Sequence, residues 1–258
     1  MKNIYKLSKI GIGVFLLALT SCGYEDPITS KVTNYPVFTL NSPDEDPVFV
    51  HEGDAYTDPG ASATVGGAAA EVTTTYTGRY RNNVFNGTLD TNVSDFYTTE
   101  YTAINEDGFS AALTRQVIVA ETGDLVNSIA GLYTSTVFRN GTQGSPASAY
   151  TDIEYILIWE NEDGTYGISD TFGGWYLFAR AIADSETPGG IIVANDIATN
   201  DFSFPGTQTN TYFGGTSEIT NLTVDPVAKT LVLTTTWVAP GSPPTNYTFV
   251  STLTQVQF

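Results

Sequence analysis

The segment from Asp170 to Tyr176 combines residue types that can bind sugars. It holds a carboxylate, three aromatic rings and two glycines, and Arg180 follows shortly after. The C–H faces of a sugar ring pack on aromatic side chains, and its hydroxyl groups bond to planar polar groups such as carboxylate and guanidinium. Tyr212-Phe213 precedes a second glycine pair in a similar arrangement. We therefore predict carbohydrate binding, with these candidate ligand residues: Asp170, Phe172, Trp175, Tyr176, Arg180 and Tyr212.

The same residues admit a structural interpretation. Glycine pairs serve bulges and tight bends in a curved sheet as well as close approach to a ligand. Trp159 and Trp237 lie in apolar runs, so we expect both in the core. Whether Trp175, Tyr176 and Tyr212 face a ligand or the core stays open at the level of sequence.

Catalytic and metal-binding chemistry has little support. His51 is the single histidine and Cys22 the single cysteine, so neither a zinc cluster nor a Ser-His-Asp triad can be assembled in the usual way. A glycosidase needs only two facing carboxylates, and the acids that could be combined in this way are Glu154, Glu160, Asp163 and Asp170. In so acidic a chain some pair is always available, so we predict no enzyme, no catalytic residue, no metal and no cofactor. Calcium at Asp44–Asp46 or Asn161–Asp163 stays open, although neither segment has the ligand alternation of an EF-hand loop.

The N-terminus has the pattern of an export signal. Three lysines precede an apolar run from Ile10 to Leu19. That run of roughly ten residues, at about 1.5 Å per residue, covers only about half of a ~30 Å hydrocarbon core and cannot span it. Leu19–Cys22 resembles the lipobox of bacterial lipoproteins, which implies cleavage before Cys22 and acylation of its thiol with fatty acids such as palmitate.

An acidic tether follows the cysteine over residues 22–34. Its Gly23–Pro27 segment resembles the surface-export signal of Bacteroidetes lipoproteins. This resemblance implies a lipid-anchored protein of the outer membrane that faces the cell exterior.

Charge limits the possible partners. The chain has 10 Lys+Arg against 28 Asp+Glu, a net charge of −18, and removal of the signal peptide takes away three lysines and no acid. The mature chain then has seven cations against 28 acids, a net charge of −21. Such a charge repels the phosphate backbone of nucleic acids, which excludes a nucleic-acid partner. It also repels anionic lipid headgroups. We expect the lipid anchor to provide membrane association and the sugar to be neutral or weakly basic.

Strand-forming residues separated by Asn, Asp and Gly turns predict an all-β protein with two domains. The first spans residues 35–120, and its expected strands are Val37–Leu40, Val48–Val50, Val72–Tyr76, Phe96–Ile104 and Leu113–Val119. Short strands at this spacing suggest a sandwich. The segments Glu52–Ala61, Tyr101–Asn105 and Arg115–Val119 resemble the immunoglobulin-like domains of bacterial surface proteins.

A hinge over residues 121–127 precedes the second domain, residues 128–258, for which we predict an antiparallel β-barrel or a curved sandwich. The expected strands are Gly131–Phe138, Ile153–Glu160, Tyr166–Ser169, Trp175–Ala179, Ile191–Ala194, Glu218–Asp225, Thr230–Val238 and Tyr247–Gln255. Turns are expected at Asn161–Gly164 and Asp225–Ala228. Because both flanks of the hinge have their own strands, we expect each domain to fold alone.

The order of a lipobox, an immunoglobulin-like domain and the Ile158–Tyr176 segment resembles a group of two-domain Bacteroidetes surface lipoproteins. Genes of that group tend to accompany starch-utilisation-like glycan uptake systems. The resemblance implies a non-catalytic glycan-binding or uptake-accessory role. The alternative is a structural or protein-interaction lipoprotein that docks to an outer-membrane transporter.

Overall fold

A computed structural model describes residues 32–258 apart from residues 45, 82–84, 87–88 and 141–148. The predicted signal peptide and Cys22 lie outside the described residues. Within the described ranges every regular element is a strand, which confirms the all-β prediction. No helix of this part of the chain is long and apolar enough to cross a membrane.

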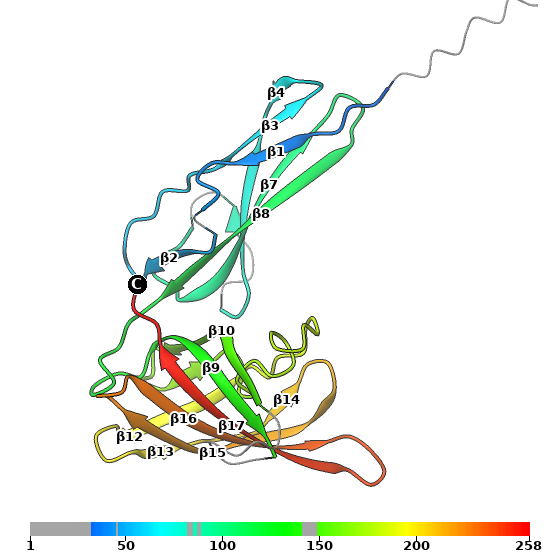
Figure 1. Ribbon diagram of the computed structural model, residues 1–258. Coiled ribbons are helices and arrows are strands. Elements are labelled where there is room, and N and C mark those ends of the chain that lie inside the picture. The colour runs from blue at the N-terminus through cyan, green and yellow to red at the C-terminus, as the bar shows by residue number, and fades with distance from the viewer. Residues whose placement is uncertain (1–31, 45, 82–84, 87–88, 141–148) are drawn as a thin grey trace, which may run out of the picture. The chain divides into compact units, whose positions relative to one another are not determined.

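The N-terminal domain consists of two small sheets (Figure 1). Its strands are β1 (Val37–Leu40), β2 (Val48–His51), β3 (Ala61–Val65), β4 (Ala68–Ala70), β5 (Thr73–Gly78), β6 (Phe85–Asn86), β7 (Asp95–Ile104) and β8 (Ser110–Ala120). One sheet has the order β1-β3-β4 and the other β2-β8-β7-β5-β6, with β2 parallel to β8 and the other pairs antiparallel. A tight turn joins β7 to β8, in which Gly108, at a positive φ of 86°, donates its backbone N–H to Asn105 O.

A carboxylate organises the interior of this domain. Asp58 accepts hydrogen bonds from the hydroxyls of Tyr101 at 2.6 Å and Tyr76 at 3.2 Å. Arg115, which is buried, lies 3.8 Å from the same carboxylate. Burial, reinforced by the charge of Asp58, raises the pKa of Tyr56 to about 12, so its hydroxyl stays protonated and can donate to Asp58 as well. Asp58 is thus the shared acceptor of three tyrosine hydroxyls, while Arg115 also donates to the carbonyl groups of Asn41 and Ser42.

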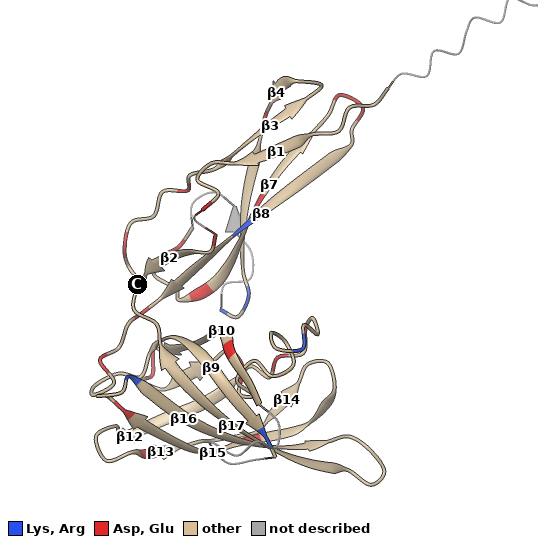
Figure 2. Cartoon of the chain, in the orientation of Figure 1, with Lys and Arg blue, Asp and Glu red and all other residues tan. Residues whose placement is uncertain are grey.

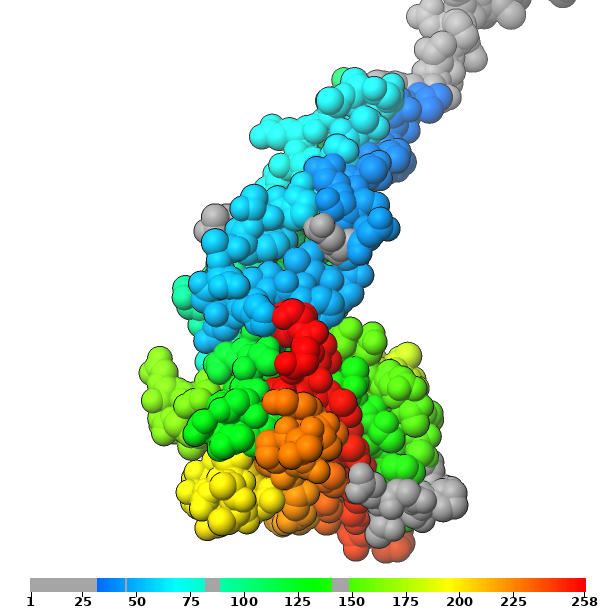
Figure 3. Space-filling model, turned by 60° about the vertical axis from the view of Figure 1, so that its left-hand side comes forward, coloured from blue at the N-terminus to red at the C-terminus, as the bar shows by residue number. Residues whose placement is uncertain are grey.

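The C-terminal domain is one curled antiparallel sheet, which confirms the curved all-β architecture (Figure 1). Its strands are β9 (Gly131–Arg139), β10 (Ala149–Glu160), β11 (Tyr166–Ile168), β12 (Gly190–Asp196), β13 (Asp201–Ser203), β14 (Gln208–Asn210), β15 (Gly214–Asp225), β16 (Thr230–Ala239) and β17 (Thr245–Gln255). The order is β13-β12-β11-β10-β9-β17-β16-β15-β14. Strands adjacent in sequence are mostly adjacent in the sheet, and the last strand, β17, closes the gap between β9 and β16, beside which it runs in red in Figure 3.

One expected strand is wrong. Trp175–Ala179 forms no strand, because residues 171–178 are a run of turns in which Gly173 and Gly174 adopt the left-handed backbone that favours glycine, with φ of 62° and 80°. A Cβ at Gly173 would overlap Ser251 Oγ of β17, so this turn segment packs directly on the sheet. The glycine pair therefore serves close packing within the domain.

The described residues 35–258 form one compact unit. An apolar cluster joins Phe96 and Ile118 of the N-terminal domain with Leu157 and Trp159 of β10. The expected place of Trp159 in the core is confirmed, as this side chain is 8% exposed.

Candidate functional site

An open pocket in the C-terminal domain is lined by Tyr212 and Phe213, the two exposed aromatic side chains in the described part of that domain. We call it the aromatic pocket, and its volume is about 470 Å³. It is lined by Arg139, Tyr176, Arg180, Ile182, Tyr212, Phe213, Trp237, Ala239 and Tyr247. Five of these nine residues are aromatic and two are arginines, whereas none is acidic.

The sheet supplies the floor of the aromatic pocket through its register. Trp237 of β16 pairs with Tyr247 of β17, and Arg139 of β9 pairs with Phe249, two residues further along β17. Directly paired residues share a face of a sheet, as do residues two apart in one strand. Trp237, Tyr247 and Arg139 therefore lie on the same face. The Trp237 and Tyr247 rings stack with centroids 5.4 Å apart.

The turn segment supplies one wall. Asp170 is fully buried and accepts three backbone N–H bonds, from Phe172 at 2.9 Å, Gly174 at 3.1 Å and Thr187 at 3.1 Å. Burial raises its pKa from 3.8 to about 6, against the opposite effect of these donors. Because Asp170 fixes the fold of the turns, it also fixes the approach of Tyr176 to the pocket.

The connection between β14 and β15 supplies the other wall. Asn210 Oδ1 accepts from the backbone N–H groups of Tyr212 at 3.2 Å and Phe213 at 2.7 Å, while its Nδ2 donates to Thr187 Oγ1 at 3.0 Å. This buried side chain ties the aromatic pair to Thr187, whose backbone N–H donates to Asp170. Gly215, at a φ of 81°, then leaves room for Trp237, because a Cβ there would lie 2.6 Å from Trp237 Nε1.

The aromatic rings form a continuous contact network. Tyr176 and Phe213 have centroids 4.8 Å apart, as do Phe213 and Tyr212. Tyr176 is 4% exposed and Trp237 also 4%, so both show only an edge to the pocket, whereas Tyr212 is 62% exposed. A ligand would therefore meet mainly Tyr212, Phe213 and Tyr247.

Two of the cations of the domain border these rings. The guanidinium of Arg139 lies 4.9 Å from the ring centroid of Trp175 and 5.0 Å from that of Tyr247, and its Nη1 donates to Tyr176 Oη at 3.4 Å. Arg180 lies 5.8 Å from the Tyr176 ring centroid. Stacking of this kind holds the planar guanidinium in place without neutralising it. Lys and Arg are few among the described residues (Figure 2).

The six predicted ligand residues divide into two groups. Tyr176, Arg180 and Tyr212 line the aromatic pocket, and their contact with a ligand stays a prediction. The other three are inside the domain: Asp170 and Phe172 are 0% exposed and Trp175 is 1% exposed. These three are corrected to structural residues, since a side chain without exposed surface cannot meet a ligand.

Six of the nine residues that line the aromatic pocket were not among the predicted ligand residues. Arg139 and Tyr247 were not considered, nor were Ile182 and Ala239. Phe213 was named only beside the second glycine pair, and Trp237 was expected only in the core, where its ring is indeed buried. The alternation of side chains along a strand predicts which face of the sheet carries Trp237 and Tyr247. Only the pairing of β17 with β9 brings Arg139 next to them. No local pattern reports that pairing.

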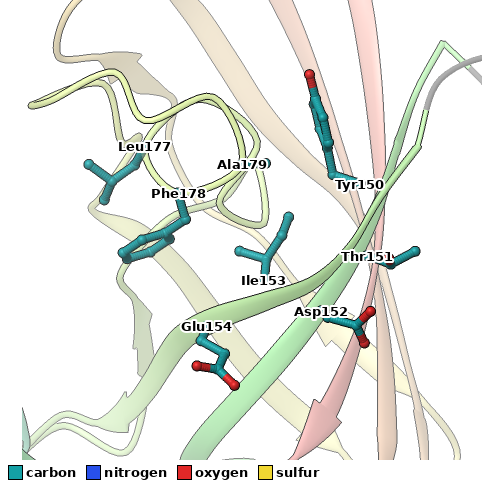
Figure 4. A pocket seen from close by; sticks show the side chains of 8 residues that line it. All are labelled: Tyr150, Thr151, Asp152, Ile153, Glu154, Leu177, Phe178 and Ala179. Atoms are coloured by element: carbon teal, nitrogen blue, oxygen red, sulfur yellow. The ribbon is translucent and has the colours of Figure 1, made fainter. Parts of the chain in front are cut away.

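A second pocket, of about 420 Å³, lies between β10 and the turn segment. Figure 4 shows that the carboxylates of Asp152 and Glu154 in it do not point toward each other. Of the other acids considered for catalysis, Asp170 is enclosed in the core. Within the described ranges no group of three or more metal-ligating side chains occurs, and the His51 ring stacks on Phe258 with centroids 4.6 Å apart.

Comparisons with known proteins agree with this architecture. A family model described as a C-terminal domain matches residues 122–255, more than half of the chain. The chain belongs to the family of this C-terminal domain. A model described as the immunoglobulin-like domain of bacterial surface proteins matches residues 39–119, which confirms the predicted resemblance of the N-terminal domain.

Among solved structures, the lipoprotein BT2262 from Bacteroides thetaiotaomicron has the same fold. Its crystal structure aligns with a TM-score of 0.55 and 23% identity, over 86% of this chain and 100% of that chain. No curated protein matches the chain. The N-terminal domain is thus of a type found in bacterial surface proteins, and the fold is shared with a Bacteroides lipoprotein.

Proposed function

We propose that the chain is a non-catalytic glycan-binding protein of the bacterial surface and that the aromatic pocket holds the sugar. The observation that carries this proposal is the composition of the pocket, in which exposed rings adjoin two guanidinium groups. A sugar ring can pack its C–H face on Tyr212 and Phe213 while its hydroxyl groups accept bonds from Arg139 and Arg180.

The pocket is also held in shape without a ligand. Asp170 fixes the turn segment and Asn210 fixes the Tyr212-Phe213 pair. A pocket formed in advance loses less conformational entropy when the ligand binds, which favours affinity. We further propose that Cys22 anchors the chain in the outer membrane facing outward, where a bound glycan can be passed to an outer-membrane transporter.

The proposal is tested by glycan-array screening of the mature chain, followed by calorimetric titration with any sugar that binds. Loss of one stacked ring costs upward of about 1 kcal/mol, roughly fivefold in affinity. Tyr212→Ala should therefore weaken binding at least fivefold without a change in thermal stability, because Tyr212 is mostly exposed.

Tyr35→Ala is the matched control, since Tyr35 is 56% exposed and belongs to the N-terminal domain. Equal binding by both variants would place the sugar outside the aromatic pocket. Failure of the intact chain to bind any glycan on the array would refute the proposed function.

A further inference from the structure

The charge distribution of the C-terminal domain is uneven. Residues 128–258 contain twelve carboxylates but only three cations: Arg139, Arg180 and Lys229. Two of these three cations line the aromatic pocket, and no carboxylate does. A strongly acidic domain therefore has a site of positive charge where its aromatic rings are most exposed.

Among the described residues, no carboxylate forms an ion pair with either arginine of the aromatic pocket. In the part of the chain that the structure describes, ion pairs are made by Arg79, with Glu186, and by Arg115, with Asp58, and none by Arg139 or Arg180. Among the described residues, the side chain of Arg139 makes one hydrogen bond, which it donates to the Tyr176 hydroxyl. Arginine has five N–H donors and stays charged at any physiological pH, so both side chains keep donors for an anion.

Local charge decides the preference of the pocket at physiological salt. The Debye length is about 8 Å at 0.15 M ionic strength, so distant carboxylates act weakly on a ligand in contact with Arg139 and Arg180. The guanidinium group matches a carboxylate with two parallel hydrogen bonds. The neighbouring rings of Phe213 and Tyr247 meanwhile offer a surface for the flat face of a sugar.

Building on the proposed function, we propose that the aromatic pocket selects a sugar with a carboxylate, a uronic acid residue, over a neutral sugar. The expectation of a neutral glycan followed from the net charge of the chain, whereas the residues that line the pocket favour the opposite preference. Arg180 is exposed at the rim and is the more accessible partner of the carboxylate, while Arg139 is held between the Trp175 and Tyr247 rings.

The test compares uronate oligosaccharides with the same oligosaccharides after reduction of their carboxylates to primary alcohols. Reduction leaves the hydroxyl pattern of the ring and removes the charge. The mature chain, purified in detergent, is titrated at 0.15 M salt with oligomers of galacturonate, glucuronate and mannuronate and with their reduced forms. We expect at least one uronate to bind tenfold or more tightly than its reduced form.

Two variants test the role of the arginine. Arg180→Met should lose most of this tenfold preference and keep the affinity for the reduced sugar. Lys229→Met removes the same charge from the third cation of the domain, whose ammonium lies 3.4 Å from Asp124 O, and should leave the preference unchanged. Both positions lie near the surface, and a thermal melt of each variant verifies folding.

Several outcomes would overturn the inference. Equal or tighter binding of the reduced sugar with loss on Tyr212→Ala would leave the proposed function intact and refute only the selection for a carboxylate. If Arg180→Met and Lys229→Met lost the preference for the uronate equally, the preference would come from net charge and not from Arg180. Tight binding of sulfated oligosaccharides alone would refute the selection for a carboxylate and indicate a sulfated sugar as the ligand. Absence of binding to every sugar would refute the proposed function as well.

Discussion

The buried carboxylate of Asp170 gives the C-terminal domain a pH dependence that can be measured. The side chain is 0% exposed and has no cationic partner among the described residues, only the three backbone N–H donors of Phe172, Gly174 and Thr187. Burial disfavours the charged form and raises the pKa to about 6, while in the unfolded chain the pKa returns to about 3.8. The folded domain therefore holds this proton more tightly than the unfolded chain does.

The direction and the size of the change in the free energy of unfolding follow from this difference in pKa. Below pH 3.8 Asp170 is protonated in both states and contributes nothing. Between about pH 4 and 6 the unfolded chain ionises first and gains stability, so the free energy of unfolding falls as the pH rises. A pKa of about 6 against 3.8 corresponds to a loss of about 3 kcal/mol, complete above pH 6.

Asp170→Asn removes this titration and isolates the effect. The free energy of unfolding of the native chain minus that of Asp170→Asn should fall by about 3 kcal/mol between pH 4 and 7, because the remaining carboxylates titrate in both proteins. Urea unfolding followed by tryptophan fluorescence reports this domain, since all three tryptophans, Trp159, Trp175 and Trp237, belong to it. Glu218→Gln, at an exposed position of β15, controls for the loss of one negative charge.

A difference that grew with pH would refute this reasoning. It would mean that the three backbone donors stabilise the carboxylate by more than burial destabilises it. The folded-state pKa of Asp170 would then lie below 3.8.

Three further predictions concern the anchor and the domains. Cys22→Ala should abolish palmitate labelling and membrane fractionation, and a variant still found with membranes would contradict the lipid anchor. Fragments 35–120 and 125–258 should each melt cooperatively in circular dichroism, at lower temperatures than the intact chain because the apolar cluster of Phe96 and Trp159 spans the cut. Asp58→Ala should destabilise the N-terminal domain by about 3–5 kcal/mol in urea unfolding, since it removes the carboxylate from the Tyr101 hydroxyl and from the buried Arg115, and a loss below 1 kcal/mol would show that other acceptors replace the carboxylate.

The sequence predicts best the strands whose side chains alternate. β7, β16 and β17 have long runs of alternating burial and were placed within a few residues. The hairpin turns also follow from local chemistry: Asp225 Oδ1 accepts from the N–H groups of Val227 and Ala228, as an aspartate at the start of a turn does.

Strands without large side chains were missed. β3 and β4 consist mainly of Ala, so their burial leaves no apolar period, and only Gly66-Gly67, with φ of 58° and 86°, indicates the turn between them. The opposite error occurred at Trp175–Ala179, where a dense run of large side chains suggested a strand. Gly173 and Gly174 adopt a left-handed backbone within a run of turns, and the backbone N–H of Gly174 donates to Asp170, which no side-chain period reports.

The residues of the candidate site could not all be predicted from the sequence, and the reason is physical. The predicted cluster around Trp175 was contiguous in sequence, yet contiguous residues in a tight turn point in different directions, so Trp175 is enclosed while Tyr176 reaches the pocket. The surface that a ligand meets is instead assembled from β9, β16, β17 and two connections. Long-range strand pairing decides its composition.

The local charge that a ligand meets also depends on strand pairing, and it affects which ligand the aromatic pocket prefers. Net charge is a sum over the sequence and predicts repulsion of anions at long range, where salt screens it most. A ligand in the aromatic pocket meets Arg139 and Arg180, which are distant in sequence and become neighbours of the same rings only after β9 pairs with β17. Since arginine beside an aromatic ring keeps its charge and its donors, the acidity of the chain as a whole does not fix the sign of the ligand that this pocket prefers.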